Sequence, residues 1–247
     1  MRKSRLFVLI VFLLVLVANA IEVNAVGTGF KTTPLQTQDK NRIISNIDIS
    51  QINEEPSTKP SISCFDVNSD GLIAIGHLGA DERKTVCVYS AEGVFQYGYA
   101  FKDSGDSIVE WDGKNLNIYF LRGSIIVSMS PTGEILDVAD VMDTAENNSY
   151  LNHLLNSTRK TVGDNEYIIR NDMGMLFEIF APSFSQLVVK DATGAESIIY
   201  DAGHGNIIAM ILSFVAFFAG GLGTIIVVVR KAVRQSDKNA YSPLKKE

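Results

Sequence analysis

Two rows of glycine residues recur in step through the middle of this chain of 247 residues. One row consists of Gly93, Gly133 and Gly194. The other row lies 22, 20 and 20 residues upstream and consists of Gly71, Gly113 and Gly174. Because glycine adopts positive φ without a steric penalty, it is typical of the tight turns that join antiparallel strands. Two such turns, repeated three times, predict three copies of one hairpin-rich unit.

Each copy divides into four short runs rich in Val, Ile, Tyr and Phe, which are separated by turn residues. The runs of the first copy are 63–67, 72–77, 85–90 and 94–101. Those of the second copy are 107–111, 116–121, 124–129 and 134–140. Those of the third copy are 166–171, 175–180, 185–190 and 197–201. The sequence therefore predicts a mainly β fold of three four-stranded antiparallel repeats, at 62–101, 104–141 and 164–202.

Four antiparallel strands with a period of about 40 residues are the pattern of a β-propeller blade. The segments FDVNSDGLIAIG and VVKDATGAESIIYD resemble blades of the NHL- or YVTN-type propeller family, and the resemblance covers residues 62–202. It implies a partial or open propeller that acts as a recognition platform. Propeller rings hold roughly four to eight blades, so three blades require either an open arc capped by other segments or a second chain that completes the ring. An ordinary antiparallel sandwich or meander is the alternative, and the sequence leaves both open.

The segment 142–163 separates the second repeat from the third. Four of its apolar side chains follow the spacing of one helix face: Tyr150, Leu151, Leu154 and Leu155. We predict a short inserted helix whose apolar residues contact a partner, because inserts between repeats often lie on the working face of such folds. The alternative is that this apolar face covers an open sheet edge.

The first 20 residues have the anatomy of a secretory signal peptide. Cationic residues precede an apolar run, which ends at the small-x-small cleavage site Ala18-Asn19-Ala20. The apolar run is shorter than the roughly 20 residues that cross a bilayer, although an uncleaved anchor is the alternative. Residues 21–61 are polar and predict a lead-in with one strand within 42–49.

Near the C-terminus, residues 207–229 form a run without a charged side chain. At about 1.5 Å per residue, a helix of this length covers roughly 35 Å, enough for a hydrocarbon core of about 30 Å. The run predicts a transmembrane helix at 206–229. Because basic residues follow at once, the tail 230–247 is predicted to be cytoplasmic, and the domain at 62–203 to lie outside the cell at the plasma membrane.

Charge restricts the class of partner. Residues 21–204 carry 13 Lys and Arg against 26 Asp and Glu, whereas the tail carries six against two. An acidic outer domain disfavours nucleic acid as a ligand and leaves an extracellular protein, peptide or glycan. In the apolar run, Ala216, Gly220 and Thr224 follow a small-xxx-small spacing that favours a homo-oligomer, unless they merely fill the helix.

The segment DVNSDG, which begins at Asp66, matches the first half of a calcium-binding loop. Its candidate metal ligands are Asp66, Asn68 and Asp70. A complete EF-hand needs Glu at the twelfth position, where this chain has His77. Since Asn, Asp and Gly are also what a hairpin turn requires, the sequence favours a turn and keeps calcium as the one candidate cofactor.

Cys64 and Cys87 lie in a segment predicted to be exported, where disulfides are common. They fall on the first and third strands of one predicted repeat, however. Such strands are roughly 9–10 Å apart, which is beyond the reach of a disulfide. The two cysteines are therefore predicted to be unpaired.

No catalytic motif stands out in the sequence. The chain lacks G-x-S-x-G, and its three histidines lie far apart, in no zinc-ligand spacing. We therefore predict a membrane-anchored extracytoplasmic binding protein rather than an enzyme. Two alternatives stay open: an extracytoplasmic hydrolase or lyase that uses carboxylates, and a structural subunit of a membrane complex.

Overall fold

The computed structural model describes residues 27–77, 83–171, 183–203 and 205–240. The chain divides into two compact units, Met1–Asp201 and Ala202–Glu247. The described part of the first unit, called the β domain below, contains all of the described strands. The predicted signal peptide lies outside the described residues.

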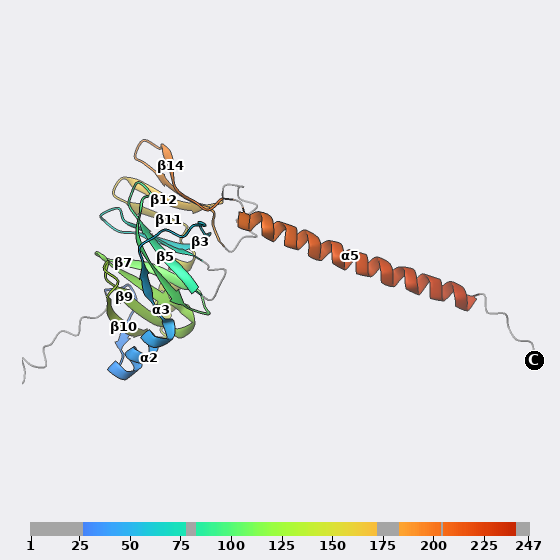
Figure 1. The fold of residues 1–247 in the computed structure, drawn as a ribbon, viewed down its shortest axis with the longest axis horizontal. Coiled ribbons are helices and arrows are strands. Elements are labelled where there is room, and N and C mark those ends of the chain that lie inside the picture. The colour runs from blue at the N-terminus through green and yellow to red at the C-terminus, as the bar shows by residue number, and fades with distance from the viewer. Residues whose placement is uncertain (1–26, 78–82, 172–182, 204, 241–247) are drawn as a thin grey trace, which may run out of the picture. The chain divides into compact units, whose positions relative to one another are not determined.

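The β domain consists of three antiparallel sheets, which confirms the predicted mainly β fold (Figure 1). Sheet 1 has the order β2-β6-β5-β4-β3, with β2 (Ser50–Ile52), β3 (Ile62–Val67), β4 (Ile73–His77), β5 (Arg83–Tyr89) and β6 (Phe95–Lys102). Sheet 2 has the order β1-β10-β9-β8-β7, with β1 (Thr32–Pro34), β7 (Ser107–Asp112), β8 (Asn115–Phe120), β9 (Ile125–Met129) and β10 (Ile135–Val141). Sheet 3 has the order β11-β12-β13-β14, with β11 (Arg159–Val162), β12 (Asn165–Arg170), β13 (Gln186–Lys190) and β14 (Glu196–Asp201).

The downstream row of glycines forms the last hairpin turn of each sheet, as predicted. The amide N of Gly93 donates to the Ser90 carbonyl at 3.0 Å, and the equivalent bonds of the other two glycines measure 3.0 and 2.9 Å. All three glycines have φ between 80° and 86°. A side chain at these positions would strain the backbone, so the recurring glycine follows from the turn.

Sheet 3 differs from the prediction at its first hairpin. The glycine between its first two strands is Gly163, whose φ of 58° equals that of Gly113 in sheet 2. Strand β12 pairs directly with β13, and the strand predicted at 175–180 lies outside the described residues. The predicted insert at 142–163 therefore extends too far toward the C-terminus, because its last residues form β11, the first strand of sheet 3.

The polar lead-in is more structured than predicted. In place of one strand within 42–49, it forms β1, the helix α2 (Thr37–Ile47) and β2. Ile43, Ile44 and Ile47 lie on one face of α2 and pack against the core between sheets 1 and 2. Burial of this apolar stripe explains why a helix forms where the local composition is polar.

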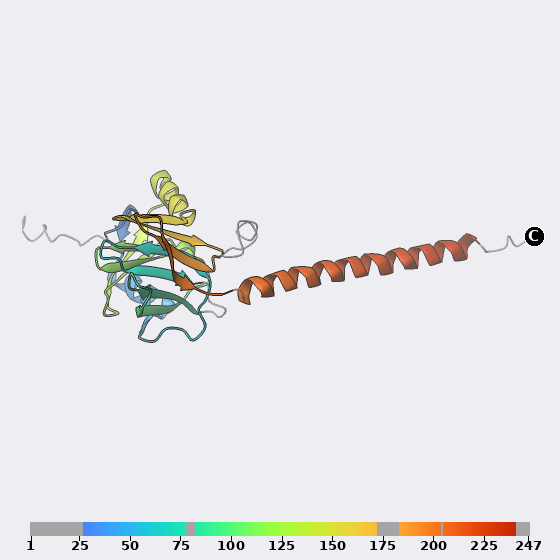
Figure 2. The same ribbon diagram turned by 90° about the horizontal axis from the view of Figure 1, so that it is seen from above.

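Sheets 1 and 2 face each other across the main core. Val86, Val88 and Phe101 of sheet 1 meet Ile118, Phe120 and Val127 of sheet 2, and all six are buried. The rings of Phe101 and Phe120 pack edge to face, with centroids 5.1 Å apart. The helix α3 (Ala145–Leu155) lies against the other face of sheet 2, and Figure 2 shows it beside the strands.

Sheet 3 packs on sheet 1. Two backbone hydrogen bonds of 2.8 Å join Ile62 to Phe184. The ring of Tyr200 on β14 stacks on His77 at 5.4 Å and packs edge to face on Tyr89 at 5.6 Å. Sheet 1 therefore lies between the other two sheets (Figure 1).

The second unit contains α5 (Gly205–Ala240), a continuous helix of 36 residues. Several of its apolar side chains are more than half exposed: Leu212, Phe214, Val215, Phe217, Phe218, Ile225, Val227, Val228 and Val229. No helix within the described part of the chain was found to be both long and apolar enough to cross a membrane.

Candidate functional site

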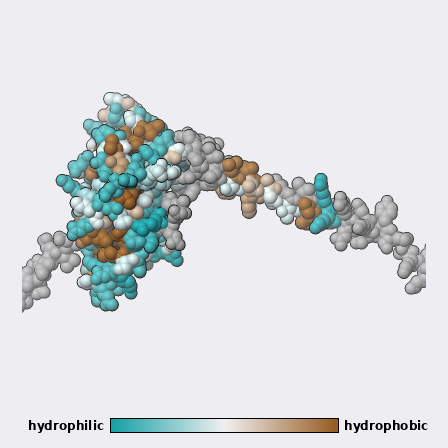
Figure 3. Space-filling view, viewed as in Figure 1, coloured by the Kyte–Doolittle hydropathy of each residue, from teal (hydrophilic) through white to brown (hydrophobic). Residues whose placement is uncertain are grey.

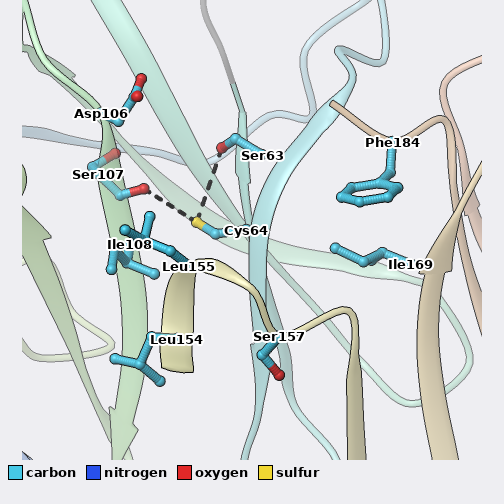
Figure 4. A pocket seen from close by; sticks show the side chains of 10 residues that line it. All are labelled: Ser63, Cys64, Asp106, Ser107, Ile108, Leu154, Leu155, Ser157, Ile169 and Phe184. Carbon is cyan, nitrogen blue, oxygen red and sulfur yellow. Dashed lines mark hydrogen bonds between the residues drawn. The ribbon is translucent and has the colours of Figure 1, made fainter. Parts of the chain in front are cut away.

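A pocket of about 210 Å³ lies where the three sheets and α3 come together, and we call it the central pocket (Figure 4). Sheet 1 contributes Ser63 and Cys64 from β3, and sheet 2 contributes Ser107 and Ile108 from β7. The other lining residues are Asp106, Leu154, Leu155, Ser157, Ile169 and Phe184. The lining is about equally polar and apolar.

Cys64 is the most reactive residue type in this pocket, but its surroundings keep it protonated. Its thiol Sγ donates to the Ser107 carbonyl at 3.4 Å, and the Ser63 hydroxyl lies 3.9 Å from the sulfur (Figure 4). Burial raises the pKa of the Cys64 thiol to about 11. Because the thiolate is the nucleophile, this cysteine is not activated for catalysis at neutral pH.

Cys64 and Cys87 are both free thiols. Strand β4 separates their strands, since Ile75 pairs with Phe65 on one side and with Cys87 on the other. The expectation that the two cysteines do not form a disulfide is confirmed. Burial raises the pKa of Cys87 as well, to about 12.

A cluster of charged side chains comes from the first strand of each repeat, and we call it the strand-junction cluster: Asp66 of β3, Glu110 of β7 and Lys160 of β11. Asp66 Oδ2 accepts from the backbone N of Trp111 at 2.8 Å, and Oδ1 forms an ion pair with Lys160 Nζ. Burial raises the pKa of Asp66 above its usual range, although Lys160 and the Trp111 amide oppose that change. The cluster therefore ties the three sheets together through a largely buried carboxylate.

Glu110 connects sheet 2 to α3 and to the lead-in. Its Oε1 accepts from the Tyr150 hydroxyl at 2.6 Å and from the Gly29 amide at 3.1 Å, and its Oε2 accepts from the Thr28 hydroxyl. Burial, followed by the neighbouring Glu110 carboxylate, raises the pKa of the Tyr150 hydroxyl. Both carboxylates at this junction are thus occupied by donors from their own chain, an arrangement that serves to hold elements together.

The ion pair of the strand-junction cluster can be tested with Lys160→Met. At pH 7 the variant leaves a charged Asp66, whose side chain is 11% exposed, without its cation. Since the Lys160 side chain is itself 38% exposed, we expect a loss of about 1–3 kcal/mol in the free energy of unfolding, below the value for fully buried pairs.

The pH dependence of this loss identifies its cause. The folded-state pKa of Asp66 is raised, and removal of the lysine raises it further, so acidification protonates Asp66 and the cost of the missing cation declines. Urea unfolding of the wild type, Lys160→Met and the charge-conserving Lys160→Arg at pH 7 and pH 4 measures this. A cost that is equal at both pH values would contradict the electrostatic explanation.

The predicted calcium ligands lie in and beside the turn between β3 and β4. Asn68 Oδ1 accepts from the amides of Asp70 and Leu72 at 3.0 and 2.8 Å, whereas Asp66 faces Trp111 and Lys160. Among the described residues, no group of three or more His, Cys, Asp or Glu side chains is placed to hold a metal ion. Asn68 therefore stabilises the hairpin turn, and calcium binding stays a prediction.

The predicted interaction residues lie on α3, and most of them pack within the domain. Tyr150, Leu151 and Leu154 pack against the cluster on the outer face of sheet 2, where the Tyr150 ring contacts Phe30 at 4.9 Å. Leu155 is 49% exposed and also lines the central pocket. The apolar stripe of α3 thus covers the outer face of sheet 2 rather than an open sheet edge, and a partner contact of these residues stays a prediction.

Sequence reasoning did not identify Glu110, Lys160 or the hydroxyl of Tyr150 as contact residues. Their partners are 40 to 94 residues away along the chain, so no local spacing pointed to them. A scan against protein-family models, a search of curated proteins and a search of solved structures found no match for this chain.

Proposed function

We propose that this chain is a single-pass membrane protein that displays its β domain outside the cell as a binding module. The exposed apolar surface of α5 is the observation that carries the proposal. Its nine described apolar side chains that are more than half exposed belong to an uncharged run, and Arg230 and Lys231 follow that run. The finding that no helix is long and apolar enough to cross a membrane concerns the described residues alone. Several side chains of this run lie outside them.

The length of α5 also supports membrane anchoring. A helix of 36 residues extends over roughly 54 Å, which exceeds a hydrocarbon core of about 30 Å and leaves turns for the basic end. In water, the exposed apolar side chains would be a strong driving force for aggregation. In a bilayer these side chains contact lipid, which removes the driving force for aggregation. The positive-inside rule directs the basic tail to the cytoplasm.

A partial propeller is the architecture that we propose for the displayed domain. The three sheets follow each other in the chain, and the first strands β3 and β7 lie side by side, as do β3 and β11. First strands at the centre and last strands at the periphery are typical of propeller blades. Strands from the lead-in extend two of the sheets, and α3 covers the outer face of sheet 2.

The hydrogen bonds and the ion pair of two carboxylates favour a binding function over catalysis. Asp66 and Glu110 converge near the first strands, yet each is engaged by donors of its own chain. A hydrolase needs such groups free to meet a substrate. With its excess of acidic residues, the domain fits an extracellular protein, peptide or glycan partner rather than nucleic acid.

Membrane fractionation tests the anchor. In cells that express the full-length chain, we expect the protein to stay with membranes after an alkaline carbonate wash and to be released by detergent. A matched variant, Phe214→Arg with Phe218→Arg, places two charges in the run, each at a cost of about 2.5–3.5 kcal/mol at the bilayer centre. We expect the alkaline wash to release this variant into the soluble fraction. Release of the wild type into the soluble fraction by the alkaline wash would contradict the proposal.

A further inference from the structure

Residues 27–30 lie along the outer face of sheet 2, beside β7 and β8. The Asn117 side-chain amide donates to the Gly27 carbonyl at 2.8 Å. The next two residues donate their hydroxyl and backbone amide to Glu110, and Phe30 packs against the apolar residues of this face. Each residue of the segment is therefore held by a contact with sheet 2.

Asp112, the last residue of β7, lies directly against this segment. Its carboxylate occupies the space that a Cβ at Gly27 would take. Among the residues that the structure describes, none donates a hydrogen bond to the Asp112 carboxylate or forms an ion pair with it. Glu110, two residues earlier on the same face, receives its hydrogen bonds from uncharged groups. The two neighbouring carboxylates therefore carry negative charge without a cation from the described part of the chain.

The Asn117 side chain adds an acceptor that lacks a donor. Asn117 is 1% exposed and lies opposite Glu110 in the pairing of β7 with β8. Its amide nitrogen donates to Gly27, whereas its buried Oδ1 has no hydrogen-bond partner among the described residues. An unsatisfied acceptor is unfavourable in a protein interior. Two carboxylates and one free amide oxygen thus lie beside the start of the segment, and all three attract a positively charged donor.

We propose that the chain is cleaved after Ala25 and that the ammonium group of the new first residue, Val26, binds beside Asp112. The inference rests on the proposed function, because a signal peptidase acts on exported chains. Water adds across the Ala25–Val26 peptide bond, and the C–N bond breaks. The water oxygen joins Ala25 as a carboxylate, and both water protons join the Val26 nitrogen, which becomes an ammonium.

Covalent geometry brings this ammonium within reach of the carboxylate. Neighbouring Cα atoms are about 3.8 Å apart and N–Cα is about 1.46 Å, so the Val26 nitrogen lies at most roughly 5.3 Å from the Gly27 Cα. The Asp112 carboxylate is in contact with Gly27, so the two charges are closer than salt screens effectively. Gly27 is exposed, and the face of the β domain in Figure 3 is mostly hydrophilic, which suits a charged chain end.

Charge distinguishes between two cleavage points. Residues 18–20 (Ala-Asn-Ala) and 23–25 (Val-Asn-Ala) share the pattern of an uncharged residue, any residue and a small residue. Cleavage after the first pattern leaves residues 21–26, whose Glu22 adds a carboxylate to a place that already has two. Cleavage after the second pattern removes Glu22 and supplies a cation. The structure thus favours the second point over the one that the signal-peptide anatomy alone predicts.

The first residue of the mature chain tests the cleavage. We expect mass spectrometry of the N-terminal peptide, from full-length protein purified from membranes, to identify Val26. Because the cleavage site needs a small residue, Ala25→Leu should abolish this end, whereas the matched Ala20→Leu should retain it. A chain that begins at Ile21 would overturn the inference and leave export, and with it the proposed function, intact. An uncleaved chain found in membranes would also overturn the inference, and the carbonate wash reports separately on the anchor.

Titration of the α-ammonium tests the contact. A nearby carboxylate raises the pKa of an α-ammonium above its usual value of about 7.7–8.0. We expect Asp112→Asn to lower this pKa by about one unit. The control Asp164→Asn, at an exposed position in the first turn of sheet 3, should leave it unchanged. The pH dependence of α-amino acylation, followed on the N-terminal peptide, gives the pKa. Equal values in the wild type and Asp112→Asn would overturn the contact.

Discussion

Replacement of Phe101 by alanine is expected to lower the free energy of unfolding by about 3–5 kcal/mol. Phe101 is fully buried between sheets 1 and 2, and its ring packs edge to face against Phe120 at 5.1 Å. Removal of the ring takes away apolar burial and leaves a cavity that neighbouring strands, fixed by their ladders, fill only in part. The effect is large because Phe101 lies within the buried core that sheets 1 and 2 share.

Urea unfolding followed by tryptophan fluorescence measures this loss. Trp111 is the single tryptophan of the chain, and its indole N–H donates to the Asp66 carbonyl at 3.3 Å, across the junction of β7 and β3. Leu136→Ala is the control, since Leu136 is 45% exposed and its truncation should change stability by no more than about 0.5 kcal/mol. A loss below about 1 kcal/mol for Phe101→Ala would mean that the two sheets do not share this core.

Acid is expected to weaken the protein through His77. This residue is 2% exposed, its Nδ1 lies 3.4 Å from the Ser61 carbonyl, and its ring stacks on Tyr200 of sheet 3. Burial lowers the pKa of His77 to about 4, from 6.5 in the unfolded chain. Between these pH values the unfolded chain binds more protons, so stability falls as the pH falls from 6.5 to 4. At about 1.4 kcal/mol for each pKa unit, the total is about 3 kcal/mol.

The variant His77→Phe isolates this effect. It retains an aromatic ring against Tyr200 and removes the titrating group, while all other ionisable groups stay the same. We expect the wild type to lose about 3 kcal/mol more than the variant between pH 7 and pH 4. Urea midpoints at the two pH values give the comparison. Parallel losses in both proteins would show that His77 is not buried as a neutral side chain.

The four repeat strands in each of the first two sheets could be predicted from the sequence because their signals are local, whereas β1 and β2 were not predicted. Alternating apolar residues and turn glycines such as Gly93 and Gly133 determine both the strands and the hairpins. The same reasoning fails for sheet 3, where the sequence predicts Gly174 as the first turn glycine and the structure has Gly163 in that turn. The segment Gly163-Asp164-Asn165 resembles Gly113-Lys114-Asn115 closely enough to have indicated the correct turn.

Contacts between distant segments could not be predicted. The bond from Tyr150 to Glu110 and the ion pair of Asp66 and Lys160 depend on how the three sheets pack, which no residue spacing encodes. The helix α2 was missed because its polar residues dominate the composition, although Ile43 and Ile47 have helical spacing. Burial against the sheets, rather than local propensity, decides the structure there.

The open edge of β14 likewise emerged only from the structure. From the sequence, β14 is one strand among twelve in three similar repeats. Only the pairing of β1 and β2 with the other two sheets shows that the third sheet lacks a covering strand.

The proposed location of the β domain outside the cell tests the account most directly. Intact cells that express either Leu136→Cys, on β10, or Ser242→Cys, in the basic tail, are treated with a thiol reagent that does not cross membranes. The native cysteines contribute little label, because burial raises the pKa of both thiols. The account predicts labelling of Leu136→Cys in intact cells and of Ser242→Cys only after permeabilisation. The reverse pattern, or labelling of neither variant before permeabilisation, would contradict it.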